Sequence, residues 1–299
     1  MIVTALLLAE SAVAAERMVS IAPVGGSESL PATLLLPDGP GPFPAIVMMH
    51  DCSGLGPRSS GAPRRWADEL LPQGFVVIIP DSFGPRGLPN GICTEDPERT
   101  RVANALVRAA DAYGALAYLR TLAEVDGRRV GVMGGSHGGF STLASMYVQV
   151  DQNNPLGTAK RNGFAAAIAL YPACGVRFGT WIVHRSDGNR GPITGYAGVY
   201  QPIAPLFILI GEADDWTPAE HCIRLAQASK AAGHPVDVKV YPGAHHSFDS
   251  ASRVVHLPQR NNANSPTGKG ATTGGQTEAW ADAKVQVASF FARHLKGQP

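Results

Sequence analysis

The feature that most constrains this chain is a serine held between glycines at the end of an apolar run. Residues 129–133 form that run, residues 134–138 are Gly-Gly-Ser-His-Gly, and a helix-like segment begins at Phe140. We interpret this as a buried strand, a sharp turn and a helix, because glycines two before and two after the serine leave room for the bend. The helix N-terminus then points free N–H groups at the oxygen of Ser136. The pattern predicts a nucleophile on a strand-to-helix turn; the alternative is a glycine-rich turn with an incidental serine.

A serine nucleophile needs a general base, and the base needs an acid to orient it. Residues 204–210 are continuously apolar, which is typical of a strand buried on both faces, and an aspartate pair follows at 214–215. Residues 236–241 alternate between apolar and polar and are followed by a histidine pair at 245–246. The chain therefore presents serine, acid and histidine in the order that this kind of turn requires.

The aspartate pair also has a simpler interpretation as a helix cap, but the sequence provides another cap. Thr217, Pro218 and Glu220 match the N-cap, the first-turn proline and the capping-box glutamate of the next helix. The residues alone leave the choice within each pair open.

Backbone N–H groups that could hold an oxyanion are predicted on two loops. The apolar run 44–49 is followed by residues 50–55, where the loop after the third strand provides one donor. The second donor is the N–H of His137, directly after the serine, and its imidazole is expected to pack rather than to act as a base. No metal is expected, because the histidines of these loops show neither H-E-x-x-H nor Cys/His ligand spacing.

Strand-like and helix-like segments alternate along the chain, which predicts an α/β fold with a mainly parallel sheet and helices on both faces. With 299 residues the chain is long enough for one large core. Its 25 basic and 24 acidic residues leave a formal net charge of +1, so nothing indicates nucleic acid or an acidic membrane surface as a partner.

Several elements are expected outside the central strands. Residues 18–21 and 32–36 predict a first hairpin. A long helix is predicted with Asp96 as its cap and Pro97 at its start, and its apolar stripe comprises Val102, Leu106, Tyr113, Leu116 and Leu119. A final amphipathic helix is expected over residues 279–295.

Three long connections, over residues 82–95, 174–201 and 250–276, follow strands at the edge where open α/β sheets bind ligands. Residues 174–201 contain Trp181 and are expected to form a pocket wall. The composition of residues 261–275 is compatible with disorder.

The first residues are similar to an export signal. An apolar run over residues 2–9 precedes Ala-Val-Ala at 12–14, a cleavage pattern, and is too short for a bilayer, which takes ~20 apolar residues. We expect a signal peptide over residues 1–15 without a basic n-region, and a single domain over residues 16–299 that is periplasmic or secreted. The alternative is an ordinary N-terminal strand or helix on a cytoplasmic protein.

The four cysteines would then meet an oxidising compartment. We expect Cys52 to pair with Cys93 and Cys174 with Cys222, because each pair flanks loops that follow successive strands. Other pairings and free buried cysteines stay open.

Together these residues resemble the dienelactone hydrolase family of α/β-hydrolases, from about Met18 to Leu295. The segments that carry the resemblance are residues 50–55, 80–83 and 134–139, Gly211-x-x-Asp214 with Pro218, and residues 246–248. The resemblance implies an α/β-hydrolase fold with a mostly parallel, eight-stranded sheet. For the site it implies Ser136 as nucleophile, Asp214 as acid, His246 as base, and the N–H groups of Cys52 and His137 as oxyanion hole.

One departure concerns the nucleophile. The enzymes that name the family use cysteine, whereas this chain has serine at position 136, which favours a broader carboxylesterase. Those enzymes also hold a substrate carboxylate with an arginine near the end of the fourth strand, and Arg86 is the candidate here, one residue out of step. Trp181 and Trp216 are further candidates for substrate binding.

We therefore predict a serine hydrolase that cleaves a small-molecule or polymeric carboxylic ester through an acyl-enzyme and needs no cofactor. A peptidase of the prolyl oligopeptidase kind and an acyltransferase would use the same triad and are the alternatives.

Overall fold

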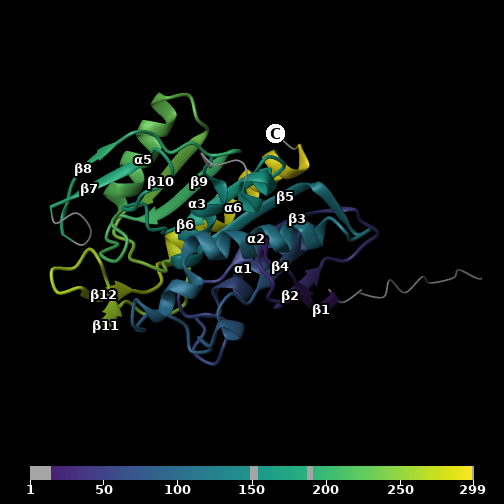
Figure 1. Ribbon diagram of the computed structural model, residues 1–299, viewed down its shortest axis with the longest axis horizontal. Helices are drawn as coiled ribbons and strands as arrows, with labels where there is room; N and C mark the ends of the chain where they lie inside the picture. The colour runs from purple at the N-terminus through teal and green to yellow at the C-terminus, as the bar shows by residue number, and fades with distance from the viewer. Residues whose placement is uncertain (1–14, 149–153, 187–190, 298–299) are drawn as a thin grey trace, which may run out of the picture.

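One sheet sets the frame of the molecule, which a computed structural model describes for residues 15–148, 154–186 and 191–297 (Figure 1). Eight strands pair in the order β1-β2-β4-β3-β5-β6-β9-β10. The pairs β1–β2 and β2–β4 are antiparallel, and every pair from β4 to β10 is parallel. The predicted eight-stranded, mostly parallel sheet is confirmed. Its strands are β1 (Ala15–Ile21), β2 (Leu30–Leu36), β3 (Phe43–Met49), β4 (Val76–Pro80), β5 (Val125–Gly135), β6 (Ala166–Leu170), β9 (Leu206–Gly211) and β10 (Val236–Tyr241).

Helices cover both faces of this sheet, because its central strands are nearly continuous apolar runs that need cover on each side. On one face α2 (Ala105–Leu119) packs against α3 (His137–Met146). On the other, α1 (Ala62–Leu70) meets α6 (Thr277–Lys296), where the rings of Trp66 and Trp280 lie 4.6 Å apart. Two further helices, α5 (Ala219–Ala231) and α4 (Pro155–Lys160), pack beside β10 and α2 respectively. The carboxyl ends of the parallel strands thus meet at one edge of the sheet.

The long helix begins later than the sequence predicts. Arg99–Ala103 form a separate 3-10 turn, and α2 starts after Asn104, whose side chain accepts hydrogen bonds from two backbone N–H groups of the first turn at 2.9 and 3.1 Å. The side chain of the expected cap, Asp96, accepts a hydrogen bond from the N–H of Glu98, in an exposed turn before the helix. Val102 and Leu106 consequently lie outside the buried stripe, 50% and 49% exposed.

Two of the long connections form β-hairpins instead of open loops. One pairs β7 (Ile182–Arg185) with β8 (Ile193–Ala197), and the other pairs β11 (Val255–Asn261) with β12 (Lys269–Thr273). The disorder that the composition of residues 261–275 allows does not occur. Its polar side chains are used internally, as where the buried amide of Asn262 donates to the carbonyls of Asp215 and Gly270.

Both expected disulfides are present, Cys52–Cys93 and Cys174–Cys222. The first joins the loop after β3 to the loop after β4, and the second joins the loop after β6 to α5. The pairing predicted from loops that follow neighbouring strands is confirmed.

No helix within the described ranges is long and apolar enough to cross a membrane. The predicted signal peptide over residues 1–15 lies outside the described residues, apart from Ala15, which opens β1.

Candidate active site

Ser136 lies on the sharp turn between β5 and α3, as the glycine pattern predicts. Its φ of 55° and ψ of −119° are values that non-glycine residues rarely adopt. The flanking glycines are required by packing. A Cβ on Gly134 would lie 2.6 Å from the carbonyl oxygen of Met49, and one on Gly138 would collide with the same atom. The N–H of Ser136 donates to the carbonyl of Leu170 at 3.0 Å, which ties the turn to β6.

Ser136, His246 and Asp214 form one chain of hydrogen bonds. Oγ of Ser136 lies 2.9 Å from Nε2 of His246, and Nδ1 of His246 lies 2.8 Å from Oδ2 of Asp214. His246 is fully buried and Asp214 is 4% exposed, while Ser136, at 9%, reaches the adjoining cavities. The arrangement allows a neutral His246 to accept the hydroxyl proton while Asp214 holds its other ring nitrogen.

Thr217 is a site residue that sequence analysis assigned to helix capping. That prediction is wrong, because α5 has Pro218 as its N-cap and no side-chain cap. The hydroxyl of Thr217 lies 2.9 Å from Oδ2 of Asp214 and 3.1 Å from Nδ1 of His246, and its N–H donates to Oδ1 of Asp214 at 2.8 Å. Thr217 therefore fixes the carboxylate that faces the imidazole.

The other members of the two pairs face elsewhere. Asp215 accepts hydrogen bonds from the N–H and the hydroxyl of Thr272, both at 2.7 Å, and so fastens β12 to the loop after β9. Nδ1 of His245 lies 2.9 Å from the carbonyl oxygen of Ala213. Of the alternatives that the residues alone left open, the structure brings Asp214 and His246 to Ser136.

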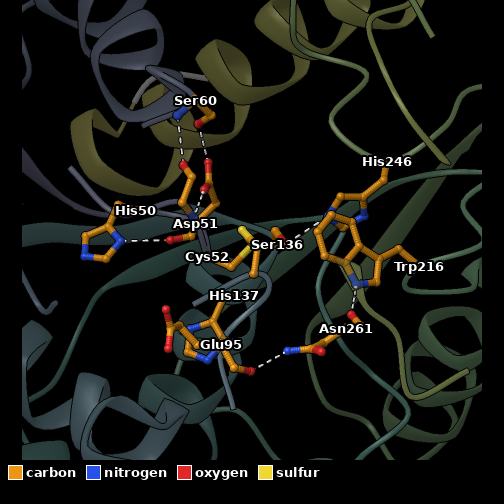
Figure 2. Close-up of a disulfide and its surroundings, with 12 residues drawn as sticks. His50, Asp51, Cys52, Ser60, Glu95, Ser136, His137, Trp216, His246 and Asn261 are labelled. Atoms are coloured by element: carbon orange, nitrogen blue, oxygen red, sulfur yellow. Dashed lines mark hydrogen bonds between the residues drawn. A yellow bond between two sulfur atoms is a disulfide. The ribbon is translucent and has the colours of Figure 1, made fainter. Parts of the chain in front are cut away.

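The two expected oxyanion donors lie around one hollow. Cys52, Ser136 and His137 line a cavity of about 270 Å³. His137 is the first residue of α3, so its N–H has no partner within the helix. Cys52 is held by its disulfide, which Figure 2 shows beside Ser136, and its carbonyl accepts a hydrogen bond from Ile92 at 2.6 Å. This arrangement can offer two backbone N–H groups to an oxygen bound at Ser136.

A buried arginine that the sequence did not indicate contacts the segments that carry the two expected oxyanion donors, Cys52 and His137. Arg108 of α2 contacts Nδ1 of His137 at 2.6 Å and donates to the carbonyl oxygen of His50 at 2.6 Å. Burial and the nearby Arg108 charge lower the pKa of His50 and of His137 well below the usual value, so both imidazoles are neutral. Burial also lowers the pKa of Arg108 to about 10. The imidazole of His137 thus contacts Arg108 and not Ser136. The sequence signal that could have indicated the role of Arg108 is an arginine among the apolar residues of a predicted helix.

Arg86 does not reach the site. Its two Nη atoms donate to the carboxylate of Asp111 at 2.7 and 2.8 Å, its Nε lies 3.3 Å from Glu28, and its side chain is 6% exposed. It lines neither cavity at Ser136. The structure thus does not bring Arg86 to Ser136, because α2 places Asp111 where it occupies both arms of the guanidinium.

Trp181 also lies away from the site. Its buried ring stacks on Tyr196 with centroids 5.3 Å apart, and its Nε1 donates to the carbonyl of Cys174 at 3.3 Å. It lines a separate hollow of about 1,210 Å³ beside α5, whose lining includes no residue of the Ser136–His246–Asp214 chain. The structure thus does not bring Trp181 to Ser136, and residues of the 174–201 connection, which were expected to form a pocket wall, line that other hollow.

Trp216, in contrast, lies at the site. Its ring centroid is 4.7 Å from that of His246, and its Nε1 donates to the carbonyl of Asn261 at 2.8 Å (Figure 2). It lines the 270 Å³ cavity and a second cavity of about 240 Å³ that contains Ser136 and His246. Trp216 thus borders both spaces next to the serine.

Tyr171 and Asp249 support His246 from behind and were missed because they form no motif. The rings of Tyr171 and His246 meet edge to face at 4.7 Å, and the Tyr171 hydroxyl donates to Asp249 at 2.9 Å. The other carboxylate oxygen of Asp249 accepts from the indole of Trp66 at 2.6 Å. Burial raises the pKa of Asp249. This network fixes the back of the imidazole.

No metal centre accompanies these residues within the described parts of the chain, where no group of three or more His, Cys, Asp or Glu side chains is arranged to hold an ion.

Comparison with known proteins gives one family and several relatives. Residues 30–295 match the dienelactone hydrolase family. A Methylorubrum extorquens protein described as a carboxymethylenebutenolidase is 24% identical over 229 residues, which cover 75% of this chain and 69% of that protein.

Solved structures share the fold. A Klebsiella pneumoniae protein described as a dienelactone hydrolase superposes with a TM-score of 0.62 at 21% identity, covering 94% of this chain and 100% of that one. Thermogutta terrifontis esterase 2 superposes with a TM-score of 0.59 at 18% identity, covering 93% of each chain. At these identities the likeness establishes the α/β fold and leaves the substrate to be argued from the site.

Proposed function

Because the chain belongs to the dienelactone hydrolase family, and so to a family of hydrolases, we propose that it cleaves carboxylic esters through an acyl-enzyme on Ser136. The observation that carries the proposal is the unbroken contact from Oγ of Ser136 through His246 to Asp214, at 2.9 and 2.8 Å. A serine hydroxyl paired with a buried imidazole and its carboxylate is the arrangement that activates an oxygen nucleophile.

In the proposed reaction, Nε2 of His246 takes the Ser136 proton and the serine oxygen attacks the ester carbonyl carbon. The resulting oxyanion accepts hydrogen bonds from the N–H groups of Cys52 and His137. His246 then gives the proton to the leaving alcohol oxygen, which leaves the acyl group on Ser136. Water, deprotonated by His246, attacks the acyl carbon and releases the acid, and the proton returns to Ser136. Every proton in this cycle passes through one imidazole, so the cycle needs no cofactor.

The contacts behind the imidazole support this direction of proton transfer. Asp214 holds the N–H at Nδ1 of His246, so that Nε2 is free to act as a base. Thr217 fixes that carboxylate through its hydroxyl and its N–H. A base held in this way needs little reorganisation during the reaction.

Ser136→Ala is the decisive variant. Alanine keeps the Cβ and therefore the turn, and we expect kcat for p-nitrophenyl acetate to fall by on the order of 10⁶. Ser27, which is exposed and lines neither cavity at Ser136, offers a matched control, and Ser27→Ala should keep turnover. A fluorophosphonate should label the wild type and the control but not Ser136→Ala.

Near-wild-type turnover by folded Ser136→Ala would exclude the serine mechanism. The same preparations distinguish the two alternative reactions. Cleavage of a p-nitroanilide without cleavage of esters would identify a peptidase. Ester formation with an added alcohol in place of hydrolysis would identify an acyltransferase.

We further propose that the domain, residues 16–299, acts outside the cytoplasm on a small-molecule or polymeric ester. The two disulfides support this, because disulfides form and persist in oxidising compartments. Fractionation of cells that produce the chain tests the proposal. A processed protein that begins near Ala15 in the periplasm or medium is expected, and an unprocessed cytoplasmic protein would contradict it.

A further inference from the structure

Two small cavities open from Ser136, one of about 270 Å³ and one of about 240 Å³. Both are lined by Ser136, Trp216 and the Cys52–Cys93 disulfide. In Figure 2 the disulfide and Trp216 stand on either side of the serine. An ester bound at Ser136 has two halves, and among the described residues these two cavities offer a space for each half.

The 270 Å³ cavity is mainly apolar. Apart from the shared wall, its lining includes the apolar residues Ile92, Pro97, Phe140 and Ala173 and the polar residues Thr100, Thr217 and Asn261. Ile92 is buried and packs with the disulfide. This cavity includes His137, the second expected oxyanion donor, and does not include His246. We call it the apolar cavity.

The 240 Å³ cavity is the more polar of the two. Besides Ser136, its lining includes Asp51, five further serines and three arginines, together with apolar residues such as Ala62, Val255 and Leu257. It includes His246 and does not include His137. We call it the polar cavity.

The path of the proton distinguishes the two spaces. In the reaction proposed above, His246 must reach the oxygen of the departing alcohol, whereas the carbonyl oxygen of the acyl group must reach the N–H of His137. The alcohol half therefore belongs on the side lined by His246, which leaves the cavity on the side of His137 for the acyl half.

We propose that the apolar cavity binds the acyl group and the polar cavity binds the alcohol, so that the preferred substrate is an ester of an apolar acid with a more polar alcohol. The inference rests on the proposed function. The volume of the apolar cavity, about 270 Å³, sets an upper limit on the acyl group. The value of kcat/KM should therefore fall once the acyl chain outgrows this cavity.

Substitutions with opposite effects on the apolar cavity test the assignment. Ile92→Ala enlarges it and should raise the octanoate-to-acetate ratio of kcat/KM for p-nitrophenyl esters by about tenfold or more, since single methylenes in apolar pockets have effects of that size. Ala173→Leu narrows the same cavity and should lower the butyrate-to-acetate ratio. The opposite signs exclude a general loss of stability as the cause.

Leu257→Ala is the matched control, because it is also an aliphatic truncation but lies in the polar cavity. It should leave the acyl-length profile unchanged while altering the ratio of kcat/KM between p-nitrophenyl acetate and glyceryl acetate. Thermal melting and fluorophosphonate labelling of Ser136 verify that each variant is folded.

An acyl profile that shifts with Leu257→Ala and not with Ile92→Ala would reverse the assignment and overturn the inference. Active variants with unchanged profiles would overturn it as well, while leaving the esterase proposal intact. A wild-type protein with no ester turnover and no labelling would instead overturn the proposed function itself.

Discussion

Asp214 is held on both of its oxygens, and this decides what its replacement would do. Oδ1 accepts hydrogen bonds from the N–H groups of Trp216 and Thr217, while Oδ2 faces His246. Asparagine would fit the same space, but an amide N–H directed at Nδ1 would hold the imidazole in the wrong tautomer. The neighbouring Asp215 is exposed, and its carboxylate accepts hydrogen bonds from Thr272 instead.

We therefore predict that Asp214→Asn lowers kcat by roughly 10⁴. Asp215→Asn should keep kcat close to that of the wild type and lower only the thermal stability, because it weakens the anchor of β12. Steady-state kinetics with p-nitrophenyl acetate and melting curves of both purified variants provide the comparison. The reverse pattern would place the acid at position 215.

Lys160 is a buried cation away from Ser136. Its Nζ donates to the carbonyls of Ala144 and Tyr147 at 2.8 and 2.9 Å and lies 3.8 Å from the centre of the Tyr147 ring. Burial lowers its pKa from 10.5 to about 7. Between these two values the unfolded chain binds more protons than the folded one, so the contribution of Lys160 to the free energy of unfolding rises with pH.

Lys160→Met should abolish this rise. We expect the free energy of unfolding of the wild type, relative to that of the variant, to increase as the pH is raised from 7 to 10 in urea titrations. The exposed Lys230, replaced in the same way, is the control and should give no comparable slope. A flat difference for Lys160→Met would show that its two carbonyl contacts keep the ammonium charged in the folded protein.

At the scale of elements, the strands could be predicted and the helix starts could not. The continuous apolar runs 44–49 and 204–210 identify β3 and β9, because a strand buried on both faces consists almost entirely of apolar residues. Several residues within a few positions of one another can cap the start of a helix. The packing of the helix against the rest of the fold determines which of them does so. Asn104 is the N-cap of α2, where the sequence predicts Asp96, and Pro218 is the N-cap of α5, where the sequence predicts Thr217. The hairpin β11–β12 was missed because its order comes from contacts with distant residues such as Asp215.

The two candidate caps of α2 give a matched test at this scale. Asn104→Ala should lower the free energy of unfolding by about 1 kcal/mol, because it removes the acceptor of two N–H groups of α2. Asp96→Ala, in an exposed turn, should change it by no more than about 0.5 kcal/mol. Equal losses in urea denaturation would mean that the helix is capped at both places.

At the scale of the whole molecule, chain order is what made the site residues predictable. Ser136, Asp214 and His246 each follow a strand, and the ends of parallel strands meet at one edge of the sheet. Arg86 and Trp181 could not be placed in this way, because their surroundings depend on partners across the fold, Asp111 and Tyr196. Contacts between residues at the ends of parallel strands can be predicted from the topology of the sheet. Contacts between side chains of other elements, such as those of Arg86 and Trp181, cannot.

The two disulfides allow stability and activity to be separated. They close loops with sequence separations of 41 and 48, so removing either pair by double Cys→Ser substitution should cost a similar ~2–4 kcal/mol. Only removal of Cys52–Cys93 should also lower kcat in the folded enzyme, because Cys52 is a proposed oxyanion donor. Melting curves, kinetics and a count of free thiols, expected to be zero in the denatured, unreduced wild type, provide the measurements. Equal kcat for the two double variants would contradict the prediction.

The position of Cys52–Cys93 beside the serine also concerns when the protein becomes active. The turn at Ser136 and the strands that carry Asp214 and His246 need only the folded backbone, whereas this wall of the site needs an oxidant as well. Under the proposals above, a newly made chain in a reducing cytoplasm would have Ser136, Asp214 and His246 in place before the loop of Cys52 is fastened. Oxidation after export would then complete the site, and the still reduced hydrolase would be less active on the esters of the cell that makes it.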